Sequence, residues 1–191
     1  MTRAPAVADL SGRPLGERAL ERRQRILAAT RTLLDERGLR ELRVADIARA
    51  VDSSPATFYQ YFAGVEDVVL ELAAAANEEL PPLLALFDGT WRGSDGRRRA
   101  TQVVEFFMDY WDRHGPLLRI RNLAADEGDR RFLELRGRAM LPILAAMEGL
   151  IERSGAADRN PGLHGASAAL AMSAILDRLA AYHRVMESEA V

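Results

Sequence analysis

Residues 44–62, VADIARAVDSSPATFYQYF, constrain the fold of this 191-residue chain more than any other stretch. Their first apolar residues share one face of a helix of about two turns, by helical periodicity: these are Val44, Ile47, Ala48 and Val51. Asp52 should end this helix, because aspartate tolerates the left-handed conformation that a tight turn needs. Ser54 and Pro55 should begin a second helix, since serine caps free N–H groups and proline suits the first helical position.

The second helix, Pro55 to Phe62, is expected to carry DNA-reading side chains. Phe58 and Phe62 are four residues apart and should pack inward, as an aromatic stripe usually does. Tyr59 and Tyr61 are two residues apart, so at least one must face outward. Hydroxyl and amide groups on such a helix can reach base edges or phosphates, as in a helix-turn-helix protein. The residues predicted to contact DNA are Arg43, Ser54, Pro55, Ala56, Thr57, Tyr59, Gln60 and Tyr61.

Charge is distributed unevenly along the chain. Residues 1–64 hold 11 arginines and 8 acidic residues, a net charge of +3, whereas residues 65–191 hold 15 arginines and 20 acidic residues, a net charge of −5. The basic end is thus the end with the helix-turn-helix pattern. One arginine cluster could form a DNA-binding arm or simply a solvated face: Arg13, Arg18, Arg22, Arg23 and Arg25.

Several function classes are disfavoured. The chain has no cysteine, which excludes disulfides, thiolate nucleophiles and cysteine-bearing metal sites. Its three histidines, His114, His164 and His183, lack metal-binding spacing, and no catalytic or nucleotide-binding fingerprint is present. We therefore expect no enzyme activity, no cofactor and no metal. No apolar run is long enough to span a membrane, so we expect a soluble, cytoplasmic protein.

The chain is predicted to be all-α. Residues 1–14 read as a flexible basic arm, residues 15–64 as the helix-turn-helix domain and residues 65–191 as a helical regulatory domain. Gly38 should end the first helix, and a linking helix should begin near residue 65. The remaining expected features are a break at Pro81-Pro82, a loop over 88–96, helices over Arg97–His114, Pro116–Glu127, Asp129–Arg153 and Pro161–Met186, and a bend at Pro142.

The chain resembles the TetR family of transcriptional regulators from about Arg18 onward. The resemblance rests on Gly38, Ile47-Ala48, Ser54-Pro55, the hexapeptide TFYQYF over residues 57–62, and Glu66-Asp67. It implies a three-helix DNA-binding domain, a helical ligand-binding and dimerisation bundle, and binding to a double-stranded operator as a homodimer. The region from VVEFFMDYWDRHG onward also resembles the regulatory half of ethionamide-resistance-type repressors.

Three departures from the family pattern affect the DNA-binding half. Arg43 replaces the threonine that usually starts the second helix, so it is expected to contact a phosphate rather than to cap. Asp52-Ser53 replaces the usual Gly-Val of the turn. Val65 replaces a lysine that touches the DNA backbone, which should make binding less sensitive to salt.

The resemblance also implies an apolar effector pocket between the later helices. The candidate ligand-binding residues are Phe106, Phe107, Tyr110, Trp111, Leu133, Met140, Ile143, Leu144, Met147, Met172 and Leu176. The alternative is that these residues are ordinary core. The candidates for a polar anchor are Asn122, Asp109, Tyr110, Asp177 and Tyr182.

Two function hypotheses follow. The first is a repressor that a hydrophobic small molecule releases from its operator. The second is an all-helical module that binds a hydrophobic ligand without specific DNA binding. The family's last dimerisation helix has no counterpart after about Met186, so a reduced interface is expected, with the face of Ala168, Met172, Ile175 and Leu179 as a possible substitute.

Overall fold

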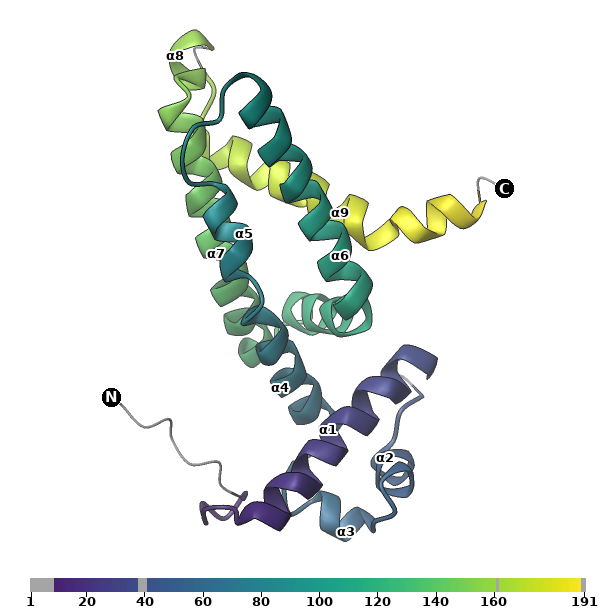
Figure 1. Cartoon of the computed structure of the whole chain (residues 1–191). Helices are drawn as coiled ribbons and strands as arrows, with labels where there is room; N and C mark the ends of the chain where they lie inside the picture. The colour runs from purple at the N-terminus through teal and green to yellow at the C-terminus, as the bar shows by residue number, and fades with distance from the viewer. Residues whose placement is uncertain (1–8, 38–40, 161, 190–191) are drawn as a thin grey trace.

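The computed structural model describes residues 9–37, 41–160 and 162–189, and over these ranges the fold is helical (Figure 1). Helices α1–α3 lie together at the lower end of the view, and α4 runs upward from them into the larger group α5–α9. The helices are α1 (Glu17–Arg37), α2 (Val44–Ala50), α3 (Pro55–Phe58), α4 (Val65–Asn77), α5 (Pro81–Leu86), α6 (Gly93–Asp126), α7 (Arg130–Arg153), α8 (Ala156–Arg159) and α9 (Gly165–Glu189).

The all-α prediction is confirmed, and the Pro81-Pro82 break separates α4 from α5 as expected. Gly38, the predicted end of the first helix, lies outside the described residues, and so does Pro161. The helix α8 has no counterpart among the predicted helices. The helix α7 continues through Pro142, and the predicted bend there stays a prediction.

The expected division between His114 and Pro116 is wrong, because α6 is one helix of 34 residues with Pro116 inside it. It also begins at Gly93, within the predicted loop. Proline lacks the N–H of one helical hydrogen bond, but Leu117 and Leu118 beside it are buried in the core, and their packing holds the helix together. His114 is therefore a buried mid-helix residue rather than the last residue of a helix.

The N-terminal core joins α1–α3 to α4. Ile26 and Leu34 of α1 pack with Ile47 of α2 and with Phe58 and Phe62. Val68 and Val69 of α4 are fully buried in the same core. Residues of α6 and α7 also belong to it. The inward packing predicted for both phenylalanines is confirmed.

A partly buried ion pair connects α1 to α4. The Arg23 guanidinium donates two hydrogen bonds to the Glu71 carboxylate and lies 4.7 Å above the ring of Phe62. A bidentate pair fixes the orientation of both side chains, and the ring covers the cation. Arg23 is thus an internal support rather than part of a DNA-binding arm.

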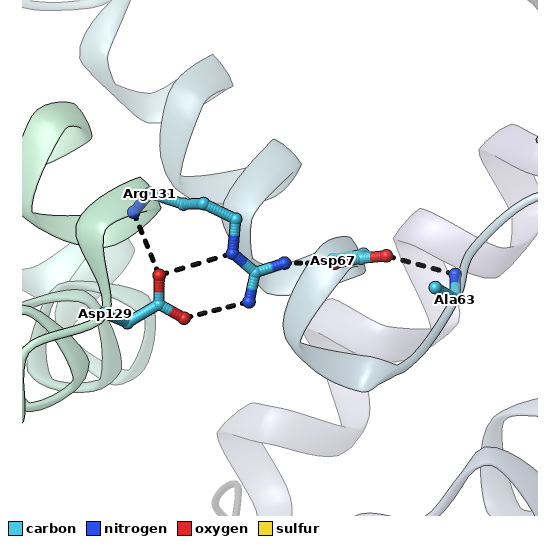
Figure 2. Close-up of polar contacts among 4 residues, drawn as sticks. All are labelled: Ala63, Asp67, Asp129 and Arg131. Carbon is cyan, nitrogen blue, oxygen red and sulfur yellow. Dashed lines mark hydrogen bonds and ion pairs between the residues drawn. The ribbon is translucent and has the colours of Figure 1, made fainter.

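A second polar contact joins the start of α7 to the start of α4 (Figure 2). Arg131 Nη1 donates to Asp67 Oδ1 at 2.7 Å, and Asp67 Oδ2 accepts from the backbone N–H of Ala63 at 3.1 Å. Asp129, the N-cap of α7, accepts from the Arg131 backbone and guanidinium. These groups fix the first turn of α4, although exposed ion pairs contribute only about 0–1 kcal/mol each.

A third contact surrounds buried His114. From α1, Arg31 Nη2 donates to the carbonyl of Arg113 at 3.0 Å and lies 3.4 Å from His114 Nδ1. From the α4–α5 connection, Glu79 lies 3.0 Å from His114 Nε2 and pairs with Arg113. Burial lowers the pKa of His114 below its ordinary value, and Glu79 opposes that shift only in part.

The larger core fills the space between α5, α6, α7 and α9. Its centre comprises Leu83, Phe107, Trp111, Ile143 and Met147. The C-terminal end of α9 projects away from this group (Figure 1).

We predict that acid destabilises the protein through His114. The pKa of His114 is lower in the folded state than in the unfolded chain. As the pH drops below about 6.5, the unfolded chain therefore binds more protons at His114 than the folded protein does, and the free energy of unfolding falls. The lowered pKa of Glu79 acts in the same direction at lower pH. The thermal midpoint, measured by circular dichroism, should fall between about pH 7.5 and about pH 5.5.

His114→Gln should flatten this dependence, whereas His164→Gln, at an exposed position, should leave it unchanged. An equal pH dependence in wild type and His114→Gln would contradict the assignment.

Candidate functional site

The turn between α2 and α3 has the geometry that its sequence predicts. Asp52 has φ +52°, in the left-handed region. Within the described ranges, no other non-glycine residue has a positive φ. The Ser53 N–H donates to the carbonyl of Ala48 at 2.9 Å. Arg25 of α1 donates to the carbonyl of Val51 at 2.9 Å, which ties the end of α2 to α1. The turn is therefore fixed by backbone bonds and by one arginine.

The start of α3 is also as predicted. Ser54 is the N-cap and its Oγ accepts from the N–H of Thr57 at 3.2 Å, with Pro55 at the first helical position. The Ser54 and Thr57 hydroxyls lie 3.0 Å apart and share a hydrogen bond. Thr57 is half-buried, so its hydroxyl is partly engaged in capping.

The helix ends at Phe58, earlier than the predicted Phe62, and this changes where Tyr61 lies. The N–H groups of Gln60 and Tyr61 donate to carbonyls three residues back, as in turns. The tighter winding rotates Tyr61 into the core, where it is 7% exposed. Tyr61, one of the residues predicted to contact DNA, is therefore buried, and Tyr59 is the tyrosine that faces outward. Tyr59 is 52% exposed and meets Phe58 edge to face, with ring centroids 5.6 Å apart.

Most of the remaining predicted residues form an exposed surface over α3 and the start of α2. The exposed members are Arg43, Ser54, Pro55, Ala56, Tyr59 and Gln60. Arg43 precedes α2 in extended conformation, and its N–H donates to Asp46 Oδ2 at 3.1 Å. Asp46 thus caps the backbone N–H of Arg43, and the Arg43 side chain is exposed. We call these six residues the α3 surface.

The arginine cluster divides into two groups. Arg13, Arg18 and Arg22 are exposed, whereas Arg23 pairs with Glu71 and Arg25 binds the α2 carbonyl. Residues 9–14 lie beside α3, because the Leu10 N–H donates to the carbonyl of Gln60 at 3.4 Å. A local turn at Asp9 holds this segment: its carboxylate accepts from Ser11 and Arg13, which lower its pKa. Exposed arginines therefore adjoin the α3 surface.

The expected effector pocket does not exist as one cavity. Six of the eleven candidates surround an inner hollow of only about 20 Å³: Phe106, Phe107, Tyr110, Trp111, Met140 and Ile143. Met147, Met172 and Leu176 line a second hollow of about 250 Å³, with Phe87 and Trp91. Leu133, Leu144 and Met140 line a third, of about 520 Å³, between α6, α7 and α9. Side chains therefore fill the predicted interior. Sites for drug-sized ligands occupy about 300–1,000 Å³, and among these three hollows the third has such a volume.

The polar anchor candidates differ in their surroundings. Asp177 accepts from Trp111 Nε1 at 3.0 Å, and burial raises its pKa. Asn122 accepts from Arg121, and the Tyr182 hydroxyl accepts from Arg178. Asp109 is exposed.

Sequence reasoning missed Arg121, which is 3% exposed in the centre of the regulatory half. A signal was present in the sequence: it lies four residues after Leu117 and four before Ala125, on the apolar face of α6. A cation in that register is buried by helical periodicity.

No group of three or more metal-ligating side chains occurs in the part of the chain that the structure describes. Nor is any helix among the described residues long and apolar enough to cross a bilayer.

Comparisons with known proteins agree with this architecture. Residues 26–72 match the family described as bacterial regulatory proteins, tetR family, and residues 84–191 match the tetracyclin repressor-like C-terminal domain. The chain therefore belongs to the TetR family, whose members are DNA-binding transcriptional regulators rather than enzymes. It is 29% identical over 163 residues to the HTH-type transcriptional regulator EthR of Mycolicibacterium smegmatis, covering 80% of this chain and 70% of EthR.

Solved structures share the fold at lower identity. NalD, the secondary repressor of the MexAB-OprM multidrug efflux pump in Pseudomonas aeruginosa, has a TM-score of 0.62 at 21% identity, with 87% of this chain and 86% of NalD covered. FadR of Bacillus subtilis, in complex with stearoyl-CoA, has a TM-score of 0.62 at 15% identity, with 88% and 89% covered. A putative TetR-family regulator from Syntrophomonas wolfei has a TM-score of 0.60 at 19% identity, with 88% and 86% covered.

We predict that Tyr61 and Tyr59 differ in their contribution to stability. Tyr61→Ala should lower the free energy of unfolding by about 3 kcal/mol, because it empties a core position. Tyr59→Ala should cost about 1 kcal/mol or less, since the residue is largely exposed. Urea unfolding followed by circular dichroism measures both changes. Equal losses for the two variants would contradict the placement of Tyr61.

Proposed function

We propose that this regulator is a repressor whose α3 surface reads the operator. The observation that carries the proposal is the exposure of Tyr59 and Gln60 in the turn that directly follows α3, where the neighbouring phenylalanines are buried. Phe58 and Phe62 anchor the inner side of this segment, and a capped turn sets the angle of α3 to α2. In such an arrangement, side chains that reach base edges are held in one orientation, which sequence reading requires.

The members of the α3 surface would have different roles. Gln60 carries an amide that can pair with adenine, and the phenol of Tyr59 can meet a base or a phosphate. Ala56 is small enough for the groove wall to approach closely. Arg43 and the exposed arginines of residues 13–22 would bind phosphates, which adds affinity without sequence preference. Tyr61 acts only through packing.

We propose residues 15–64 as the DNA-binding domain and residues 65–191 as the regulatory domain, with α4 linking them. An apolar small molecule bound in the regulatory half would release the protein from DNA. The apolar lining of the hollow of about 250 Å³, with Phe87, Trp91, Met147 and Leu176, suits an apolar effector smaller than a drug-sized ligand. Release requires only that the effector bind more tightly to the state that does not fit the operator.

The exposed face of α9 supports a homodimer as the operator-binding form. Large apolar side chains are exposed to water along this face, which is energetically unfavourable, and a second copy of the chain would cover them. They are Met172, Ile175, Leu179, Tyr182 and Met186. This surface contains three of the residues named from sequence as a substitute interface.

We predict that Gln60→Ala weakens specific DNA binding. Loss of one base contact should reduce affinity for the operator about 5- to 150-fold, while affinity for unrelated DNA stays the same. The measurement is a gel shift at one stated salt concentration, with the promoter region beside the protein's own gene and a scrambled duplex of equal length. Gln102→Ala, at an exposed position of α6, is the matched control.

If Gln60→Ala and Tyr59→Ala both bind the operator as wild type does, the α3 surface is not the reading surface. If wild type gives no specific band, the protein is instead the hydrophobic-ligand module of the second hypothesis.

We predict that Ile175→Glu converts the dimer into a monomer, because a carboxylate at the centre of an apolar interface is left without a partner. Sedimentation analysis in the micromolar range measures the mass. Leu10→Glu places the same charge at another exposed leucine, away from α9, and should leave the dimer intact. A dimeric Ile175→Glu protein would exclude this face as the interface.

A further inference from the structure

Arg121 is a buried cation without a counter-ion. Its Nε and Nη2 donate to Asn122 Oδ1 at 3.1 and 3.0 Å, and its Nη1 donates to Asn77 Oδ1 at 3.3 Å. Both acceptors are neutral amides, and no carboxylate oxygen lies within 4.0 Å of the guanidinium among the described residues. A guanidinium has five N–H groups, so these bonds leave two of them for another acceptor.

Burying such a charge costs free energy unless it is paired. Burial accordingly lowers the pKa of Arg121, and Tyr110 and Asp177 oppose this shift only in part. The position is therefore costly for the protein as it stands, and a bound anion would relieve the cost.

Two buried hydroxyls near this cation also lack hydrogen-bond partners in the described part of the chain. They belong to Tyr110 on α6 and Ser173 on α9, which are 5% and 1% exposed. Buried polar groups are normally hydrogen-bonded, and an unpaired one costs about 1–3 kcal/mol. The two unpaired hydroxyls and the remaining N–H groups of Arg121 could together bind a polar group of a ligand.

The hollow of about 520 Å³ leads to this place. Arg121, Asp177 and Met140 line both this hollow and the small inner one, so they form the wall between the two. Ser173 lines the larger hollow, which continues between apolar side chains of α7 and α9: Leu133, Leu141, Leu144 and Leu170. One end of the hollow is thus polar and the rest apolar.

The other charged groups of the hollow have partners. Arg136 donates to Asp126 at 2.5 Å, and Arg178 lies 4.6 Å from the centre of the Tyr182 ring. Asp177 accepts from Trp111. With three arginines against two aspartates in the lining, the hollow has one surplus positive charge, and Arg121 is the buried arginine of the lining, with no ion pair to a described residue.

We propose that this hollow binds an amphipathic carboxylate, with the carboxylate on Arg121 and the Ser173 hydroxyl and the apolar chain along α7 and α9. The proposal rests on the proposed effector-responsive function and assigns a second effector site, with a ligand of stated chemical class. A charged head group distinguishes this site from the apolar hollow beside Trp91.

The same contact connects the site to α4. Asn77 is the last residue of α4; its Oδ1 accepts from Arg121, and its Nδ2 donates to the carbonyl of Leu135 on α7 at 3.2 Å. A carboxylate bound to the remaining N–H groups of Arg121 would draw the guanidinium toward itself and so weaken its bond to Asn77. Since Glu71, on the same helix, holds Arg23 of α1, a shift of α4 is transmitted to the DNA-binding helices.

The test is isothermal titration of the full-length protein with decanoate and with methyl decanoate, both below the concentration at which they aggregate. Wild type should bind decanoate, and the methyl ester should bind about 10- to 100-fold more weakly, because it cannot accept charge-assisted hydrogen bonds in the same way. Arg121→Met should lose the preference for decanoate. Arg138→Met, at an exposed position of α7, is the matched control and should keep it.

Ser173→Ala keeps the test valid if Arg121→Met does not fold. It removes an unpaired buried hydroxyl, so the thermal midpoint should stay the same or rise while decanoate affinity falls about threefold or more. Equal binding of acid and ester to wild type, an unchanged preference in Arg121→Met, or no binding of decanoate would each overturn the proposal.

A gel shift with operator DNA separates this outcome from failure of the proposed function. Decanoate should weaken operator binding by wild type and not by folded Arg121→Met. If the operator is bound specifically but the acid does not bind the protein, the carboxylate site is wrong and the DNA-binding function stands. If the acid binds through Arg121 and no operator is bound, the repressor function is wrong and the site stands.

Discussion

The packing of α4 against both halves of the molecule is the constraint on which the rest of the structure depends. Val68 and Val69 are fully buried in a core that also contains side chains of α1, α2, α6 and α7. Ala76, near the other end of the helix, belongs to the core of the regulatory half. Burial of this apolar area stabilises the helix at about 25 cal/mol per Å². The two halves therefore cannot move independently without disturbing α4.

Polar contacts are concentrated at points where α4 meets its neighbours. Asp67 meets α7, Glu71 meets α1, and Asn77 meets α6 and α7. Directional bonds of this kind define one arrangement among those that apolar packing alone would permit. In the proposed mechanism, these bonds would connect a ligand in the regulatory half to the DNA-binding helices through α4.

Local sequence signals predicted the DNA-binding end well. Asp52, Ser54 and Pro55 act through their own backbone preferences, so the turn and the start of α3 could be read directly. Helical periodicity failed for Tyr61, because α3 ends after one turn and the periodicity no longer applies. The predicted division at Pro116 failed because a proline can kink a helix without ending it, and α6 continues through this residue.

The sequence by itself determined the helical class, the helix-turn-helix pattern and the inward packing of Phe58 and Phe62. These depend on residues within a few positions of one another. Only the tertiary structure decided that Arg23 supports α4 instead of contacting DNA, that the apolar residues surround three hollows instead of one, and that Arg121 lies beside Asn77. Those outcomes depend on side chains far apart in the chain, and whether a polar group is paired once buried is set by the neighbours that folding brings to it.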